Sequence, residues 1–306
     1  MEAPANDDIA TLNTRHGAPG RIVFRPSPTG RPFVALANKY GSAEVSLYGA
    51  HVTSYRPTGN LPVLFMSKLT DFRPGTAIRG GIPVCWPWFG SCGAPGSAKH
   101  GFARVSAWSV KGTEYSEEET AITLALSDTE ATRAAWPHPF SLELRISLAM
   151  KLTLVLSTVN TGTEPFGITE GFHPYFLVKD RNAATLRGVD GCPCVDARDM
   201  REFVQTGDLA LDAETDHVFT VSRREYALLD PGLRRAIAVA SRGNSKLVVW
   251  NPGPVAEGAV PNLAPDDWRG FVCVEPATLF RDAAIEIAPG GRHELWMAVQ
   301  SVPENP

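Results

Sequence analysis

The stretch from Ser141 to Ser157, which reads SLELRISLAMKLTLVLS, decides the fold class. Every even-numbered residue from Leu142 to Leu156 is apolar, and most of the odd-numbered residues between them are polar. This period of two is typical of strands with one buried face. An ordinary strand has about 3–10 residues, so we expect this longer run to bend, bulge or turn near Met150 and Lys151. The stretch predicts a β-sheet with one apolar face to cover.

Shorter segments predict further strands on both sides of this stretch. Residues 122–126 alternate in the same way, and short apolar pieces separated by Pro, Gly and Asn fill residues 22–55. We expect other strands at 61–66, 185–186, 236–240, 247–250, 271–275, 284–287 and 295–299. Residues 128–136 are expected to form one or two helical turns, ended by Pro137. Because two packed antiparallel sheets cover each other's apolar faces, the chain is predicted to be an all-β, large antiparallel β-sandwich.

The sequence divides into a short N-terminal piece and one domain. Residues 1–20 have no cationic start and no apolar stretch, so they are not a secretory signal, and we expect a flexible tail. Residues 21–306 contain no internal repeat and no low-complexity linker, which predicts a single β-sandwich domain. No run approaches the roughly 20 apolar residues that span a bilayer.

Charge and cysteine content restrict the class of protein. The formal net charge of -4 argues against a nucleic-acid partner, which requires a basic face. Five cysteines, an odd number without a CxxC pair, are typical of a reduced cytosolic protein. The pair Cys192 and Cys194 has no assigned role. We therefore expect a cytoplasmic protein, monomeric, without nucleic-acid or membrane partners.

The segment from Thr76 to Arg104 combines features of a core strand with those of a binding loop. Gly80 and Gly81 allow sharp backbone bends, while Pro83 and Pro87 exclude a helix or a central strand. Its aromatic residues offer flat apolar faces, and its polar residues offer charge and hydrogen bonds (Trp86, Trp88, Phe89; Arg79, Lys99, His100, Arg104). This mixture predicts a concave site for a polar ring that bears an anion. A buried aromatic connection is the alternative.

Two later residues are candidates for proton transfer. His173 lies among aromatic residues, and histidine titrates near neutral pH. Glu275 follows the apolar run Phe271 to Val274, where burial would raise the pKa of its carboxyl group towards the range of a general base. Each has a structural alternative: a hydrogen-bonded core histidine and a salt-bridged glutamate. His100, His173 and Glu275 could also be metal ligands, although no HxH or HExxH spacing supports this.

At these residues the sequence resembles the D-hexose-6-phosphate mutarotases (glucose-6-phosphate 1-epimerases) of the aldose 1-epimerase, or galactose mutarotase-like, superfamily. Five motifs in register carry the resemblance over residues 40–300: AIRGGIPVCWPWFG, HGFAR, FHPYF, VVWNPG and VCVEPA. The resemblance implies a galactose mutarotase-like supersandwich and an isomerase that interconverts the α and β anomers of hexose 6-phosphates. It also implies that neither metal nor cofactor is needed.

The resemblance also implies roles for individual residues. His173 and Glu275 match the catalytic pair, and Arg79 and Arg104 match arginines associated with the substrate phosphate. The matching substrate-binding positions are His100, Lys99 and Asp216. Two departures stand out: Lys99 replaces a glutamine of some relatives, and Pro174 replaces a threonine.

The residue types fit the implied chemistry. Opening a hemiacetal ring and closing it on the other face needs one group that takes a proton and one that gives a proton. We assign Glu275, as carboxylate, to the O1 hydroxyl and protonated His173 to the ring oxygen. Trp86 or Trp88 could stack on the apolar face of the sugar, or belong to the core.

Other functions remain open at this point. An epimerase for free aldoses would leave Arg79, Lys99 and Arg104 without an anionic partner. A non-catalytic sugar-phosphate-binding sandwich would not need both His173 and Glu275. A metal-dependent sugar-phosphate isomerase would be inactivated by a chelator.

Overall fold

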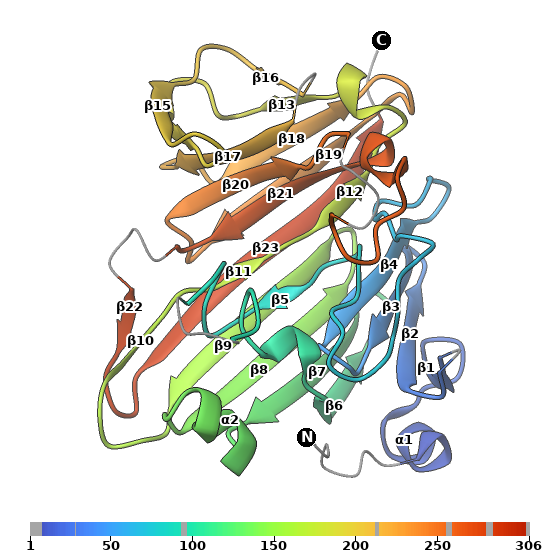
Figure 1. Ribbon diagram of the computed structural model, residues 1–306. Helices are drawn as coiled ribbons and strands as arrows, with labels where there is room; N and C mark the ends of the chain where they lie inside the picture. Colours follow the sequence, from blue (N-terminus) through green and yellow to red (C-terminus); the bar gives the residue numbers. More distant parts are fainter. Residues whose placement is uncertain are drawn as a thin grey trace.

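The structure is a computed structural model that describes residues 8–27, 29–92, 97–211, 214–254, 259–279 and 284–303. Two large antiparallel sheets dominate this part of the chain (Figure 1). The predicted all-β, antiparallel β-sandwich class is confirmed. The fold follows from the alternating sequences, because each large sheet has an apolar face that is buried against the other sheet.

The first sheet has nine strands in the described residues. In spatial order they are β16 (Leu209–Ala210), β13 (Thr185–Arg187), β18 (Glu225–Asp230), β19 (Arg235–Arg242), β23 (Arg292–Pro303), β9 (Leu152–Asn160), β8 (Phe140–Leu148), β7 (Thr120–Ser127) and β6 (Ser109–Tyr115). The long alternating run forms the hairpin of β8 and β9, with Leu148 opposite Leu152. Met150, at the expected turn, is 64% exposed. The predicted turn near Met150 and Lys151 is therefore confirmed.

The second large sheet has eight strands in the described residues. Its spatial order is β15 (Arg201–Val204), β14 (Pro193–Asp196), β17 (Thr215–Thr220), β20 (Lys246–Asn251), β21 (Phe271–Ala277), β11 (Gly171–Phe172) and β5 (Val84–Cys85), and β12 (Tyr175–Leu177) also pairs with β21. Neighbouring strands β11 and β12 are separated by His173 and Pro174, so this sheet carries the histidine at a break between two strands.

Smaller elements surround the two sheets. A four-stranded sheet contains β1 (Ile22–Pro26), β2 (Pro32–Asn38), β3 (Gly41–Ser46) and β4 (His51–Pro57), and β10 (Phe166–Ile168) pairs with β22 (Ile285–Ile287). The helix α2 (Glu130–Ala135) matches the helical turns expected at 128–136. Three short 3-10 helices are η1 (Ala103–Val105), η2 (Arg181–Ala183) and η3 (Asp267–Gly270). None of the described helices has the length and apolarity needed to cross a lipid bilayer.

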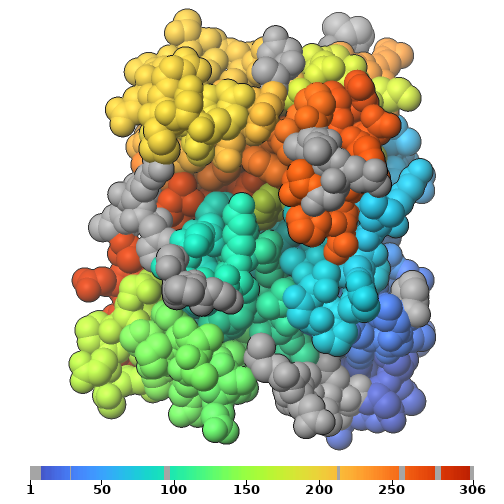
Figure 2. Space-filling model, viewed as in Figure 1, coloured from blue at the N-terminus to red at the C-terminus, as the bar shows by residue number. Residues whose placement is uncertain are grey.

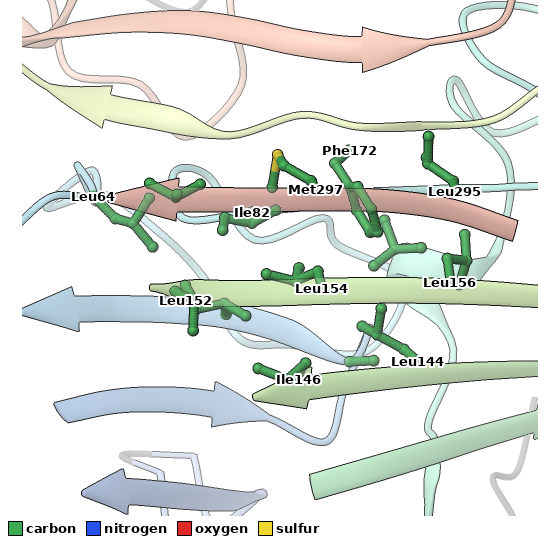
Figure 3. Packing of buried hydrophobic residues seen from close by; sticks show 14 of the residues in the cluster. Leu64, Ile82, Leu144, Ile146, Leu152, Leu154, Leu156, Phe172, Leu295 and Met297 are labelled. Atoms are coloured by element: carbon green, nitrogen blue, oxygen red, sulfur yellow. The ribbon is translucent and has the colours of Figure 1, made fainter. Parts of the chain in front are cut away.

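The hydrophobic core lies between the two large sheets (Figure 3). Even-numbered residues of β8 and β9, such as Leu144 and Leu154, are fully buried. Opposite them are Phe172 of β11 and Ile82, which precedes β5. The core therefore packs against one face of the eight-stranded sheet, and the candidate site lies on its other face. Close packing of the aliphatic side chains holds this sheet rigidly. Cys192 and Cys194 are free thiols in this same core.

Two regions differ from the structure expected from the sequence. The expected flexible tail contains the helix α1 (Ile9–His16), which lies beside β1 (Figure 1); residues 1–7 are outside the described part. Leu12 is buried, and the Asn13 side chain bonds the backbone of Phe24 in both directions. The strand expected at 61–66 forms only isolated bridges, because Leu64 pairs with Phe176 while Met66 pairs with Gly80.

Candidate active site

A cavity of about 860 Å³ lies over the eight-stranded sheet, on the face opposite the core. Figure 2 shows this side of the molecule, hollowed between the yellow segments near residue 200 and the teal stretch near residue 100. All seven residues predicted for the site line this one cavity (Arg79, Lys99, His100, Arg104, His173, Asp216 and Glu275). Their positions span almost 200 residues of sequence, so the sheet brings them together.

His173 and Glu275 face each other at the base of the cavity. Nε2 of His173 lies 3.4 Å from Oε1 of Glu275, and both side chains are nearly inaccessible to solvent. Glu275 belongs to β21, whereas His173 follows β11, the neighbouring strand. Nδ1 of His173 and Oε2 of Glu275 are buried and have no hydrogen-bond partner among the described residues. Such buried polar atoms without partners are costly in a core; because these two residues line a cavity, a bound ligand can reach them.

The surroundings set the protonation of this pair. Burial lowers the pKa of His173 well below its usual value, and the charges of Arg104 and Arg79 lower it further. Burial raises the pKa of Glu275 well above its usual value, and the nearby Asp216 adds to this effect. Both shifts favour the uncharged forms, a neutral imidazole beside a protonated carboxyl group. This is the reverse of the proton placement assigned from the sequence, although the pair still holds one transferable proton.

Three cations occupy the cavity wall. Nε of Arg79 donates to the Pro261 carbonyl at 3.0 Å, and its Nη1 donates to the Tyr175 hydroxyl at 2.9 Å. Nη2 of Arg104 donates to the carbonyl of Lys99, while its Nε is buried without a partner in the described residues. Neither arginine nor Lys99 forms an ion pair with any described carboxylate. Unpaired cations on a cavity wall form a site for an anion.

The glycines of the central stretch allow this arrangement. Gly101 has a φ of +72°, and a Cβ added there would lie 2.0 Å from the Trp86 carbonyl oxygen. This close approach folds the chain back so that His100 reaches the cavity. Nδ1 of His100 accepts a hydrogen bond from the Gly90 amide at 3.1 Å, which leaves Nε2–H as the donor of the neutral ring.

Asp216 completes the polar lining on the other side of Glu275. It belongs to β17, and its neighbour on β20 is Trp250. Burial raises the pKa of the Asp216 carboxyl group, while Lys99 acts in the opposite direction. A carboxyl group there can hydrogen-bond the hydroxyl groups of a sugar.

The two tryptophans considered for stacking belong to the core. Trp86 and Trp88 are buried outside the cavity lining, and their indole N–H groups bond Thr158 and the Ala98 carbonyl. Of the two roles considered from the sequence, stacking on the sugar or membership of the core, the structure supports the core for both.

Comparison with known proteins agrees with this architecture. The profile of the aldose 1-epimerase family matches residues 32–300. The chain is 34% identical over 236 residues to a protein of Escherichia coli K12 provisionally named glucose-6-phosphate 1-epimerase, covering 77% of this chain and 79% of that one. It is 31% identical over 274 residues to a Cenchrus ciliaris protein of the same provisional name, covering 86% and 82%.

The chain belongs to the aldose 1-epimerase family. It is thus an isomerase, as the sequence predicted. Its structure superimposes with a TM-score of 0.87 on that of a Salmonella typhimurium protein provisionally described as a mutarotase, at 29% identity over 94% of this chain and 96% of the other.

Sequence reasoning missed two aromatic residues at the centre of this epimerase. Trp250 lines the cavity, and its ring meets the His173 ring edge-on at 5.7 Å. Tyr175 stacks on the other side of the imidazole. Both lie within the motifs VVWNPG and FHPYF, but aromatic residues in strands are usually core residues, so their residue type did not indicate a place in the site.

One side-chain cluster keeps the metal hypothesis testable. Donor atoms of His173, Cys273 and Glu275 lie within 4.8 Å of one another, and all three residues are buried. Histidine, thiolate and carboxylate are donors that zinc accepts. Burial raises the pKa of the Cys273 thiol well above its usual value, which opposes the thiolate form that zinc requires.

Proposed function

We propose that this epimerase interconverts the α and β anomers of hexose 6-phosphates, with His173 and Glu275 as the proton-transfer pair. One observation carries the proposal: three cations without carboxylate partners in the described residues share a single cavity with a buried His–Glu pair. The first feature suits a phosphate and the second suits proton transfer. A sugar phosphate needs both within the length of one molecule.

The reaction begins from the neutral pair. Glu275 donates its proton to the ring oxygen as the bond between C1 and that oxygen breaks. His173 takes the proton of the O1 hydroxyl, and the electron pair left on O1 forms the C1 carbonyl. Rotation about the C1–C2 bond then presents the other face of the carbonyl, and the same steps in reverse close the ring. Each proton transfer contributes about 10²–10⁴-fold to the rate.

The phosphate binds to Arg79, Arg104 and Lys99. A guanidinium group can donate two parallel hydrogen bonds to phosphate oxygens, and Lys99 adds a third charge at the exposed rim. These cations also lower the pKa of His173, after burial. A bound phosphate offsets their charge and so makes His173 a stronger base for the O1 proton.

His100 and Asp216 orient the sugar. The Nε2–H group of His100 is a donor, and the carboxyl group of Asp216 is an acceptor, so together they can bond two hydroxyl groups of one ring. Trp250 supplies the apolar surface that Trp86 and Trp88 do not supply. The names of the Escherichia coli and Cenchrus ciliaris relatives support the same substrate class.

The alternatives account for less of the cavity. An epimerase for free aldoses leaves the cations of Arg79 and Arg104 unpaired when substrate is bound, at a cost in free energy. A sugar-phosphate-binding protein without activity needs no acid and base 3.4 Å apart.

Two-dimensional exchange NMR on glucose 6-phosphate tests the proposal. Cross-peaks between the α and β anomeric protons should grow faster when the wild-type protein is present. Line broadening without faster exchange would indicate a binding protein and would contradict the proposal.

A further inference from the structure

We propose that Tyr175 is a positioning residue that serves two groups of the site at once: its hydroxyl holds the Arg79 guanidinium for the phosphate, and its ring holds the His173 imidazole for proton transfer. The proposal rests on the proposed function and adds a residue that the sequence analysis did not assign. Tyr175 is the first residue of β12 and lies opposite Cys273 of β21.

The hydroxyl end of Tyr175 contacts the phosphate site. Nη1 of Arg79 donates to this hydroxyl at 2.9 Å, and Nε of Arg79 donates to the Pro261 carbonyl. These are the two described acceptors that hold the guanidinium, and neither is a carboxylate. The two bonds therefore fix the orientation of the guanidinium, and no described carboxylate compensates its charge. Removing the hydroxyl would leave one backbone acceptor and a freer cation.

The ring of Tyr175 contacts the proton-transfer site. It stacks on the His173 ring with a centroid distance of 4.9 Å and an interplanar angle of 10°. Because Nδ1 of His173 has no hydrogen-bond partner among the described residues, packing sets the direction in which Nε2 points. Trp250 and His100 meet the imidazole edge-on, so Tyr175 supplies its parallel contact.

Tyr175 is itself firmly held. It is 1% exposed, its amide donates to the Gly81 carbonyl at 2.8 Å, and its carbonyl accepts from the Phe65 amide at 2.9 Å. Its ring also packs against Phe271 at 5.0 Å. Arg79 and His173 line the cavity, whereas Tyr175 lies behind them and is absent from the described lining. A rigid residue behind two lining residues can fix their separation, which must match the distance from the phosphate to C1.

Two substitutions separate the two ends of Tyr175. Tyr175→Phe removes the hydroxyl and keeps the ring, and Tyr175→Leu removes both. The matched control is Tyr226→Phe: Tyr226 is also buried, and its hydroxyl donates to the Arg223 carbonyl at 2.8 Å, in a different part of the sandwich. Binding is measured by calorimetry with 1,5-anhydroglucitol 6-phosphate, which lacks the anomeric hydroxyl and cannot react.

We expect Tyr175→Phe to bind this phosphate about 10-fold more weakly than wild type, because it loses a hydrogen bond to a charged group. Its KM for glucose 6-phosphate should rise similarly while kcat stays near the wild-type value. Tyr175→Leu should show the same loss of binding and, in addition, a kcat lowered by about 10-fold or more, since misplacing a reacting group is costly. Tyr226→Phe should match wild type in both.

Three results would overturn the role of Tyr175 alone: wild-type binding by Tyr175→Phe, an equal fall of kcat in the Phe and Leu variants, or the same losses in Tyr226→Phe. A different result would overturn the proposed function and the inference together. That result is wild-type protein binding 1,5-anhydroglucitol 6-phosphate no better than 1,5-anhydroglucitol. The Phe variant keeps the ring packing, so the test of the hydroxyl does not depend on whether the Leu variant folds; thermal unfolding of the Leu variant checks its fold before its kcat is interpreted.

Discussion

The described residues contain two histidine–glutamate pairs whose glutamates are buried, and the surroundings of the two pairs differ. In the first, Nε2 of His173 is 3.4 Å from Oε1 of Glu275. In the second, Nε2 of His293 on β23 is 2.9 Å from Oε1 of Glu170, only three residues before His173 in the chain. Both glutamates are 1% exposed.

Their surroundings separate the two pairs. Burial, Arg104 and Arg79 all lower the pKa of His173, and burial and Asp216 raise the pKa of Glu275, so both shifts favour the uncharged forms. Burial also acts against the charge of His293, but the Glu170 carboxylate outweighs it and raises the pKa of that imidazole. The first pair lines the cavity, whereas the second is absent from its described lining. The cavity and the nearby charges are the reasons for which we propose the first pair, and not the second, as the proton-transfer site.

The largest effect is expected from the pair in the cavity. Glu275→Gln and His173→Ala should each reduce anomer exchange by about 10²–10⁴-fold, because each removes one of the two proton-transfer groups. Exchange NMR on glucose 6-phosphate measures the loss, and thermal unfolding should show that both variants fold.

His293→Gln is the matched control, because it breaks the other pair. Its exchange rate should stay within a few-fold of wild type. If His293→Gln lost as much activity as His173→Ala, the distinction between the two pairs would be wrong.

A smaller loss of activity is expected from substitution of the arginines near His173, which have no counterpart among the main groups that shift the pKa of His293. Arg104→Ala should lower kcat/KM for glucose 6-phosphate by about 10- to 100-fold, since a hydrogen bond to a charged group is worth about 1.5–3 kcal/mol. Activity on free glucose should hardly change.

The control for Arg104 is Arg187→Ala. Arg187 belongs to β13, pairs with Asp208 and is not part of the described cavity lining. It should leave both activities unchanged. Equal losses on both substrates in Arg104→Ala would show that Arg104 supports the loop and does not bind phosphate.

The third effect concerns stability and its pH dependence. His293→Gln should lower the free energy of unfolding by about 1–3 kcal/mol, because Glu170 loses its buried partner. The folded-state pKa of His293 is raised, so this stabilisation is fully present below the ordinary histidine value of about 6.5 and is lost as the pH rises through the raised pKa.

Urea unfolding of wild type and His293→Gln between pH 6 and pH 9 measures this dependence. The difference in stability between the two proteins should shrink as the pH rises. A difference that grew with pH would mean that His293 is neutral in the folded protein.

No effect is expected from chelation. Dialysis against EDTA should leave the exchange rate unchanged, because protonated Cys273 and the neighbouring cations of the cavity oppose a divalent ion near His173 and Glu275. Activity that is lost on treatment with EDTA and restored by zinc would show that the reaction needs a metal ion, with His173, Cys273 and Glu275 as its candidate ligands.

Periodicity made the fold predictable, and motifs made the site predictable. The alternation from Leu142 to Leu156 depends only on local sequence, so it indicated the β8–β9 hairpin and its turn. The motifs around His100, His173 and Glu275 predicted site residues that the structure brings into one cavity.

Other features depend on contacts between distant residues. Glu170 and His293 pair over 123 positions of sequence, and neither residue type nor spacing marks such a pair. The helix at Ile9–His16 was missed because Leu12 is its one buried residue, which gives a weak apolar period. The protonation of His173 depends on Arg79 and Arg104, whose proximity only the folded sheet establishes.

The central claim is that the proton-transfer pair and the phosphate-binding cations act on one substrate molecule. Exchange NMR on an equimolar mixture of glucose 6-phosphate and glucose in one tube tests it most directly, because competition at one site gives the ratio of the two kcat/KM values. Two arginines that each bind phosphate predict a preference for glucose 6-phosphate of about 100-fold or more. Equal exchange of both sugars, or faster exchange of glucose, would contradict the account.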